Sequence, residues 1–216
     1  MNTAEELRAL KLFKGADQQT LETLLPICKM RRYAKNTILY YENDALTSAY
    51  ILVRGVIKAY KVDRFDNEIF LYFLRGGELL TKLTHKGEIV CFENAECTED
   101  CEILSLELAS LQKLILASSS LMCTFLEESH RRIASLERII NREIVFDGTA
   151  KVAHMLAQEL GEFNALKKQE IAYILNIQPE TLSRILKKLH RDGVITTNSL
   201  GQIEILNPQR LNEIHQ

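Results

Sequence analysis

The chain begins with apolar residues at helical spacing and then changes to the short apolar runs that are typical of strands. In residues 3–30, leucine and phenylalanine recur three or four positions apart, which predicts short helices. Asp17 is placed to cap the second of these helices, and Pro26 lies near its end. From Thr37 onward, short β-type runs occupy residues 38–40, 50–53, 56–60, 69–73 and 103–106.

Turn-forming residues separate these runs. The segments between them, which include residues 42–44, 54–55, 65–67 and 76–78, contain Gly, Asn and Asp, the residues that favour tight turns. Many short strands joined by regular turns predict a compact antiparallel barrel or jelly roll. We therefore expect residues 1–118 to form a β-roll domain that carries short helices at its N-terminus.

A single long helix is predicted next. Residues 119–146 contain neither Gly nor Pro, and at 1.5 Å per residue a helix of this length extends roughly 40 Å. Side chains recur within it at alternating spacings of four and three, which is the pattern of a coiled-coil seam. The seam has one polar break at Ser129, and its apolar members are Met122, Leu126, Ile133, Leu136 and Ile140. Such a seam can join two subunits, or it can pack against the chain's own β-roll.

Two short amphipathic helices are predicted within residues 167–191. Each carries apolar side chains along one face: Ile171, Ile174 and Leu175 on the first, and Leu182, Ile185, Leu186 and Leu189 on the second. Polar residues interrupt the apolar rhythm at 176–178, and Pro179 suits the first turn of the second helix. Two helices joined by a tight turn form a helix-turn-helix, whose second helix can enter the major groove of DNA.

The second of these helices has a polar face that is suited to nucleic acid. Glu180, Ser183, Arg184 and Lys187 lie away from its apolar residues. Arginine can bond to two acceptors of guanine, and a carboxylate can accept a hydrogen bond from cytosine. The alternative is a solvated helix face with no partner. The combination of the break, the proline and this polar face favours DNA binding.

A change of domain is expected at residues 147–149, Asp-Gly-Thr. Glycine ends the long helix, and Asp147 or Thr149 can cap the helix that follows. After the helix-turn-helix, two short β-type runs flank residues 198–201 and predict a β-hairpin, the wing of a winged helix. The predicted organisation is a β-rich domain at 1–118, a long helix at 119–146, and a winged helix-turn-helix domain at 147–216; the family resemblance described below implies that these are a sensory domain, a dimerisation helix and a DNA-binding domain.

The overall charge adds a constraint on how DNA would be bound. The 216 residues carry a formal net charge of −2, so the chain as a whole is not a polycation. Basic residues nevertheless outnumber acidic ones between residues 167 and 192, where they are Lys167, Lys168, Arg184, Lys187, Lys188 and Arg191. DNA affinity would therefore come from local charge and would depend on salt.

The sequence also bears on where the protein works. The first residues lack the charged and apolar regions of a signal peptide, and no apolar stretch approaches the roughly 20 residues that span a bilayer. Five cysteines, an odd number, fit a reducing compartment better than a disulfide framework. We expect a cytoplasmic protein without a membrane partner.

Several motifs resemble those of the CRP/FNR family of bacterial transcription regulators. They are the sequences at 169–172 and 180–184, Leu189 with the Gly-Val-Ile at 193–195, and the strand pair at 49–57. The spacing of Glu180, Ser183 and Arg184 is similar to that of the FNR branch. The resemblance implies an α+β fold made of a cyclic-nucleotide-binding-like β-roll, a long dimerisation helix and a C-terminal winged helix-turn-helix.

The resemblance also implies roles for individual residues. It assigns base reading to Glu180, Ser183 and Arg184, on a palindrome of TTGA-type half-sites. It assigns contacts with the DNA backbone to Gln169, Thr181 and Lys187. It further implies a homodimer, with RNA polymerase as a partner.

The signal is expected to enter through the β-roll. By resemblance, Gly77, Glu78 and Leu79 occupy the place where cyclic-nucleotide-binding relatives hold the ribose and phosphate. Those relatives complete the site with an arginine on a later strand, but no arginine lies between Lys86 and Arg131. The charge partner of the phosphate is therefore missing, which disfavours a cyclic nucleotide such as cyclic AMP. The effector, whether a small molecule, a gas or a redox signal, is not identified by the sequence.

Neither an iron–sulfur cluster nor haem is supported by a recognised motif. An iron–sulfur cluster would need close-set cysteines, but the five lie at Cys28, Cys91, Cys97, Cys101 and Cys123, and a turn at 98–100 would be needed to bring Cys97 and Cys101 together. Structural thiols are the favoured interpretation. Haem would need a ligand such as His85, His130 or His154, and none of these has a motif around it. The cofactor is left unassigned.

Two other classes of function were weighed against a DNA-binding regulator. A nucleotide-responsive regulatory module without DNA binding would explain the β-roll but not the predicted winged helix. An enzyme would need a nucleophile–base pair, a phosphate-binding loop or paired carboxylates, and the sequence contains no such motif. We therefore expect the protein not to be an enzyme.

Overall fold

The computed structural model describes residues 4–82, 84 and 87–215, and its internal contacts divide the chain into two units, Met1–Ser135 and Leu136–Gln216. The first unit opens with the short helices α1 (Ala4–Ala9), η1 (Lys11–Phe13), α2 (Gln18–Leu24) and η2 (Leu25–Ile27). Asp17 caps α2 as expected, because its carboxylate accepts a hydrogen bond from the Thr20 N–H at 2.7 Å. The helical prediction was wrong at its end, since strand β1 already begins at Cys28.

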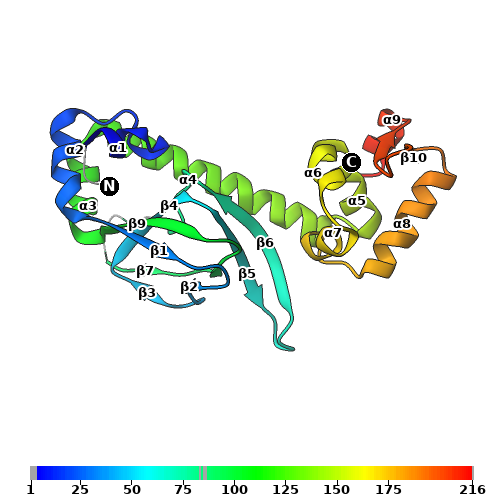
Figure 1. Cartoon of the computed structure of the whole chain (residues 1–216), viewed down its shortest axis with the longest axis horizontal. Helices are drawn as coiled ribbons and strands as arrows, with labels where there is room; N and C mark the ends of the chain where they lie inside the picture. Colours follow the sequence, from blue (N-terminus) through cyan, green and yellow to red (C-terminus); the bar gives the residue numbers. More distant parts are fainter. Residues whose placement is uncertain (1–3, 83, 85–86, 216) are drawn as a thin grey trace. The chain divides into compact units, whose positions relative to one another are not determined.

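Antiparallel strands follow these helices in the first unit (Figure 1). A three-stranded sheet has the order β1 (Cys28–Tyr33), β9 (Cys101–Glu107), β4 (Ser48–Arg54). A four-stranded sheet has the order β2 (Ile38–Tyr40), β8 (Asn94–Cys97), β5 (Val56–Val62), β6 (Glu68–Arg75), and a short pair joins β3 (Ala45–Leu46) to β7 (Ile89–Val90). The antiparallel β-roll predicted from the sequence is confirmed, although strands β1, β3, β7 and β8 had not been foreseen.

The tight turn between β4 and β5 requires a glycine. Gly55 joins β4 to β5 with φ of 105°, and a Cβ atom there would lie 2.6 Å from Cys101 Sγ and 2.9 Å from the Asp100 carbonyl oxygen. No side chain fits into that space, so only glycine lets the β4–β5 turn pack against the start of β9.

The apolar core of the first unit lies between the helices and the three-stranded sheet. Helix α3 (Leu108–Ala117) and the start of α4 (Ser119–Ile140) contribute to it together with α1 and α2. Its fully buried members include Phe13, Leu21, Ile51, Leu104 and Leu106. Leu121 and Phe125 of α4 belong to the same cluster, which attaches the start of α4 to the β-roll.

The predicted long helix is present but does not stay α-helical to its end. After α4, residues Asn141–Val145 form a π-helical turn, in which the Phe146 N–H donates to the Asn141 carbonyl at 2.9 Å. Among the described residues, no single helix has the length and apolar character to cross a membrane. One bent pair, Leu108–Ala117 with Ser119–Val145, passes a test of length and composition only when its two halves, 113° apart, are taken together.

The second unit is a helical bundle with a small hairpin. Its elements are α5 (Gly148–Gln158), α6 (Leu160–Ala165), α7 (Lys168–Ile174), α8 (Pro179–Arg191), β10 (Ile195–Thr197), β11 (Ile203–Ile205) and α9 (Pro208–Glu213). Asp147 is the residue that caps α5, by accepting from the Ala150 N–H at 2.8 Å. The hairpin that the sequence predicted is confirmed, and in it Ile195 pairs with Ile205.

Candidate DNA-reading helix and sensor pocket

The turn between α7 and α8 has the geometry of a helix-turn-helix. Helix α7 ends in a pair of hydrogen bonds, from the Asn176 N–H to the Tyr173 carbonyl at 3.1 Å and from the Ile177 N–H to the Ala172 carbonyl at 3.0 Å. This Schellman pattern requires a left-handed residue, and Asn176 supplies it with φ of 50°. Pro179 then opens α8. The break that the sequence predicted at 176–178 is confirmed.

One face of α8 anchors it to the bundle. Leu182, Ile185, Leu186 and Leu189 are buried, and they share a core with residues of α5 and α7 such as Val152 and Ile171. Because these four side chains repeat at helical spacing, their burial fixes which side of α8 is turned outward.

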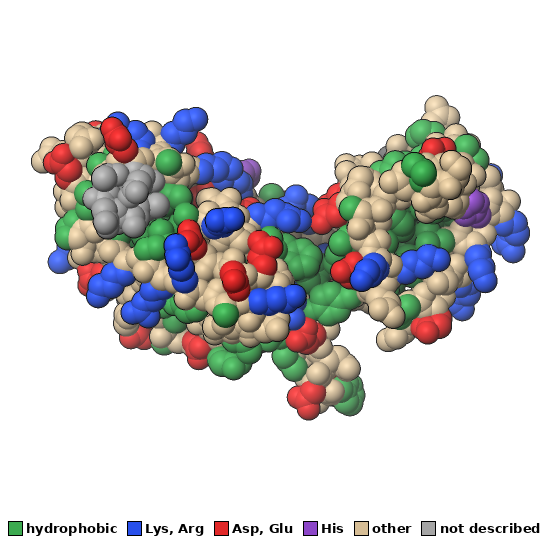
Figure 2. Space-filling view, in the orientation of Figure 1, with side chains coloured by type: hydrophobic (Ala, Val, Ile, Leu, Met, Phe, Trp, Pro, Cys, Tyr) green, Lys and Arg blue, Asp and Glu red, His purple; other side chains and the backbone are tan. Residues whose placement is uncertain are grey.

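The opposite face of α8 gathers the residues to which base reading was assigned. Pro179, Glu180, Ser183, Arg184 and Lys187 line one shallow, open depression. Glu180, Arg184 and Lys187 are exposed and Ser183 is half-buried. Figure 2 shows lysine and arginine side chains gathered over this helix. Within the described part of the chain, these four polar side chains make no hydrogen bond or ion pair, so their donors and acceptors are available to a partner.

The residues expected to contact the DNA backbone come from both helices. Gln169 is exposed in the first turn of α7, and Thr181 is half-buried in the first turn of α8. Glu170 is not available in the same way, because its carboxylate accepts from the Lys167 N–H at 2.7 Å and caps α7. The start of each helix thus presents a polar side chain and unpaired backbone N–H groups, which suit phosphate.

In the first unit, the residues expected to bind an effector run beside β4 and are hydrogen-bonded to it. The Gly77 N–H donates to the Leu52 carbonyl at 2.7 Å, and the Leu52 N–H donates to the Glu78 carbonyl at 2.9 Å. The exposed Glu78 carboxylate accepts from the Arg75 N–H at 2.5 Å. Leu79 is buried in the apolar core. Glu78 therefore stabilises its own turn in this structure, and an effector role for these three residues stays a prediction.

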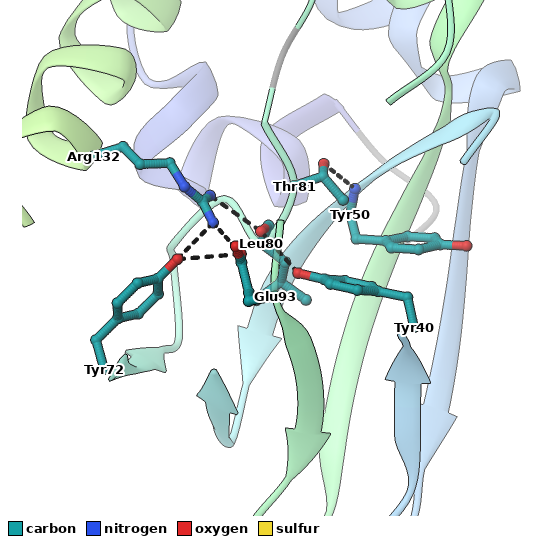
Figure 3. Close-up of polar contacts among 7 residues, drawn as sticks. All are labelled: Tyr40, Tyr50, Tyr72, Leu80, Thr81, Glu93 and Arg132. Carbon is teal, nitrogen blue, oxygen red and sulfur yellow. Dashed lines mark hydrogen bonds and ion pairs between the residues drawn. The ribbon is translucent and has the colours of Figure 1, made fainter. Parts of the chain in front are cut away.

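A polar cluster that the sequence did not reveal lies where α4 packs on the β-roll (Figure 3). Arg132, on α4, donates to the Leu80 carbonyl at 3.1 Å and to the Tyr72 hydroxyl at 2.8 Å, and it pairs with the carboxylate of Glu93. Tyr72 also donates to Glu93, at 3.1 Å. The Glu93 side chain is only 3% exposed. The one signal in the sequence is that Glu93 follows Cys91 and Phe92 in an otherwise apolar segment.

The electrostatics of this cluster keep Arg132 charged. Burial raises the pKa of Tyr72, and the negative charge of Glu93 adds to the rise although Arg132 opposes it. Burial acts to lower the pKa of Arg132, but the interactions with Tyr72 and Glu93 outweigh burial, so the net shift of this pKa is upward. The guanidinium and the carboxylate therefore form a buried ion pair.

A small cavity adjoins the ion pair. It has a volume of about 10 Å³ and is lined by Glu93 together with Tyr40, Leu80, Thr81, Lys82, Ile89, Val90, Cys91 and Phe92. That is enough space for a single water molecule. The second carboxylate oxygen of Glu93 is buried and has no hydrogen-bond partner among the described residues.

The cysteines are free thiols with differing surroundings. Cys97 and Cys101 are both buried, and the turn at 98–100 brings their side chains together. Burial, followed by the neighbouring Cys101, raises the pKa of the Cys97 thiol to about 12. The Cys101 thiol also contacts the Glu99 carbonyl at 3.3 Å. Both buried side chains pack as small apolar groups, whereas Cys123 is exposed on α4.

The histidines do not gather into a ligand set. His130 is exposed, His154 packs at 5.2 Å from His215, measured between ring centroids, and His85 lies outside the described residues. Burial, together with His215, lowers the pKa of His154. Within the described ranges, no group of three or more His, Cys, Asp or Glu residues is arranged to hold a metal ion.

Helix α4 has two apolar stripes. Leu121 and Phe125 are buried against the β-roll, whereas Leu126 is 70% and Ile133 is 53% exposed. Met122 and Ile140 are also exposed, and Leu136 is half-buried. For Met122, Leu126 and Ile133, packing against the chain's own β-roll is therefore contradicted. These seam residues leave an apolar surface uncovered.

Comparisons with known protein families agree with both units. A model of the cyclic nucleotide-binding domain matches residues 30–118, and a model of the Crp-like helix-turn-helix domain matches residues 150–214. The two matches fall on the β-roll and on the bundle that contains α8. The chain belongs to the CRP/FNR family of bacterial transcription regulators.

Individual relatives cover nearly the whole chain. The cyclic AMP receptor protein of Thermus thermophilus is 23% identical over 212 residues, which are 96% of this chain and 98% of the relative. Among solved structures, a CooA mutant from Carboxydothermus hydrogenoformans has a TM-score of 0.73 at 18% identity and covers 96% of this chain and 95% of its own. FixK2 from Bradyrhizobium japonicum has a TM-score of 0.64 at 20% identity and covers 88% of this chain and 98% of its own.

These findings settle the class of function. The protein is a DNA-binding transcription regulator of the CRP/FNR type, with a cyclic-nucleotide-binding-like domain and the predicted α+β architecture. The alternative of a nucleotide-responsive module without DNA binding is wrong, because the Crp-like helix-turn-helix match spans the bundle and the wing. DNA is therefore a partner of this chain.

Proposed function

We propose that this CRP/FNR regulator acts as a homodimer that pairs through the exposed stripe of α4. The observation that carries the proposal is the exposure of Met122, Leu126 and Ile133 beside the buried Leu121 and Phe125. Leaving such an apolar stripe in water is unfavourable, and a second copy of the same helix buries it in a coiled-coil seam. A two-fold dimer then sets two α8 helices one turn of DNA apart, about 34 Å, on an inverted repeat.

The proposed half-site is of the TTGA type. Arg184 would bond to the guanine, and Glu180, one turn earlier on α8, would accept from the cytosine paired with it. Ser183 lies between them on the same face and would contact a neighbouring base. The proposal is supported by the depression in which these three side chains meet and by their lack of partners within the described chain.

Gln169, Thr181 and Lys187 are proposed to position the helix rather than to specify the sequence. Gln169 and Thr181 lie in the first turns of α7 and α8, where free backbone N–H groups also favour phosphate. Lys187 lies one turn beyond Ser183 at the edge of the depression, and its ammonium would neutralise a phosphate.

We propose that the β-roll senses a signal other than cyclic AMP. A cyclic nucleotide is an anion, and the buried carboxylate of Glu93 beside the small cavity would repel its phosphate. Arg132, the cation closest to that carboxylate, is already paired with it, and the Lys82 ammonium lies 5.0 Å from the centre of the Phe92 ring.

The remaining parts of the proposal rest on membership of the family. The protein is proposed to work in the cytoplasm, to contact RNA polymerase when bound to DNA, and to have no catalytic activity of its own. The transcription regulators among its relatives support this assignment.

A binding titration tests the proposal. Fluorescence anisotropy would be measured on a duplex with two inverted TTGA half-sites, on one with a single half-site scrambled, and on one with both scrambled. The duplex with two half-sites is expected to bind most tightly and the duplex with both scrambled most weakly. Adding 1 mM cyclic AMP is expected to leave each affinity unchanged. Equal affinity for the first two duplexes would contradict the dimer, and tighter binding with cyclic AMP would contradict the assignment of the signal.

A further inference from the structure

The carboxylate of Glu143 connects the end of the long helix to the turn of the helix-turn-helix. Glu143 lies in the π-helical turn that follows α4, within the unit Leu136–Gln216. Its Oε1 accepts from the side-chain amide of Asn176 at 3.0 Å, and its Oε2 accepts from the Lys151 ammonium at 2.8 Å. The Arg142 guanidinium donates to Oε1 as well. Three segments therefore meet on one carboxylate.

Lys151 extends the connection to the end of α7. Its side chain is only 9% exposed, and its ammonium donates both to Glu143 and to the Leu175 carbonyl, at 3.2 Å. Leu175 is the C-cap of α7, where unpaired carbonyl groups and the helix dipole favour a positive charge. A buried ammonium needs a counter-charge, and Glu143 supplies it.

The electrostatics keep Glu143 ionised. Burial acts to raise the pKa of its carboxyl group, but the hydrogen bonds from Lys151, Arg142 and Asn176 outweigh it, and the net shift is downward. At neutral pH the carboxylate therefore holds all three donors.

The side chain of Asn176 makes a contact that the shape of the turn does not require. The turn needs a left-handed residue, and glycine adopts that conformation at lower cost than asparagine. Asparagine adds an amide that reaches Glu143. The amide ties the residue that shapes the turn, three positions before the start of α8, to the end of the long helix.

The π-helical turn is the segment whose rearrangement would move the Glu143 carboxylate. A π turn contains one more residue than an α turn, and such turns in long helices often lie at functional sites. Ile144 and Val145, beside Glu143, are 78% and 66% exposed, so these two side chains are not packed into the described core of the chain. A change in the register of the turn would carry the Glu143 carboxylate with it.

We infer that Glu143 is a positioning residue for DNA recognition, which sets α8 through Asn176 and Lys151 according to the state of the turn at the end of α4. This inference rests on α8 being the DNA-reading helix. It does not require any particular half-site sequence. A merely structural role would instead make Glu143 and its partners matter for the stability of the bundle alone.

Asn176→Gly separates the two roles. The substitution keeps the left-handed turn and removes the amide, so the thermal midpoint is expected to stay the same or to rise. Affinity for a duplex selected by the wild-type protein is expected to fall about tenfold, while affinity for a random-sequence duplex stays within twofold. The matched control is Asn43→Gly, which removes another left-handed asparagine, with φ of 70°, from the β-roll. It should leave both affinities unchanged.

A reciprocal exchange provides a second, independent readout. Glu143→Gln combined with Asn176→Asp restores the hydrogen bond with donor and acceptor reversed, and it is expected to recover most of the specific affinity that Asn176→Asp alone loses. Unchanged specific affinity in Asn176→Gly would overturn the inference, as would an equal loss on both duplexes accompanied by a lower thermal midpoint. Because every variant is compared on a duplex chosen by the wild type, an error in the TTGA assignment would not alter the comparison.

Discussion

The guanidinium of Arg132, on α4, is paired with the carboxylate of Glu93, which is almost completely buried inside the β-roll. The two residues are 39 positions apart in the chain, and the pair is joined by Tyr72 and the Leu80 carbonyl. The same helix carries the exposed seam on another side. Any change of Arg132 would therefore act on the helix through which we propose that two subunits meet.

The first prediction concerns this buried ion pair. Arg132→Met should lower the free energy of unfolding by about 3 kcal/mol, because it leaves a buried carboxylate without its partner. Replacing both charges, as in Glu93→Gln with Arg132→Met, should restore much of that loss, since no unpaired charge remains. Urea unfolding followed by circular dichroism measures both variants. If Arg132→Met lowered the free energy of unfolding by less than the double substitution does, the ion pair would not be what stabilises α4 on the β-roll.

The dimer seam is tested by a charge at its centre. Ile133→Asp should give a monomer, because an aspartate that is buried between two apolar stripes would be desolvated without a partner. The loss of the second subunit should weaken binding to the inverted repeat far more than binding to one half-site. Val62→Asp is the matched control, since Val62 is an exposed apolar residue outside α4. Sedimentation that still shows a dimer of Ile133→Asp would assign the interface to another surface.

The parts of the fold that the sequence predicted well have local signals. Helix α8 was predictable because its four buried residues repeat at helical spacing and a proline marks its start. The Gly55 turn was predictable from Arg-Gly between two apolar runs. Strand β1 was missed because three of its six residues are Lys or Arg and exposed, so that it lacks the apolar face of an ordinary strand. Strand β8 was missed because Asn94 and Glu96 make it look like a loop, although Asn94 is buried.

The candidate site divides in the same way. The residues that we propose to read DNA, Glu180, Ser183 and Arg184, lie about one helical turn apart on α8, so their spacing in the sequence already places them on one face. Arg132 and Glu93 meet only through the packing of α4 on the β-roll, and no spacing rule joins them. Glu143, Lys151 and Asn176 are likewise collected from three elements. Such polar clusters depend on tertiary packing, which a single sequence does not display.

The thiols provide a test of the sensor by pH. Burial and the neighbouring Cys101 raise the pKa of Cys97 to about 12, and burial raises that of Cys91 to about 11. At pH 8 these thiols are protonated, and their reactivity should rise only as the pH approaches those values. Alkylation at pH 8 followed by mass spectrometry should therefore label Cys123 first. Cys97→Ser with Cys101→Ser should keep DNA binding, and loss of an oxidant response in that variant would assign the pair a redox role.

Lys187 should affect binding without affecting sequence preference. Lys187→Ala removes a phosphate contact, so it should weaken every duplex alike and reduce the salt slope of the binding constant by about one. Anisotropy titrations at several salt concentrations measure that slope. Lys35→Ala, in the β-roll, is the control and should leave it unchanged. A loss confined to one base pair would instead make Lys187 a base-reading residue.

Selection from random duplexes tests the central claim most directly. The wild-type protein should enrich an inverted repeat of TTGA-type half-sites, and Arg184→Ala should lose about 1–3 kcal/mol of affinity and most of its preference at the G·C pair, where only Glu180 then reads the cytosine. The other positions should keep their preference, because Arg184 does not contact them. An enriched site without that G·C pair, or an unchanged preference in Arg184→Ala, would contradict the assignment of α8 as the helix that reads this sequence.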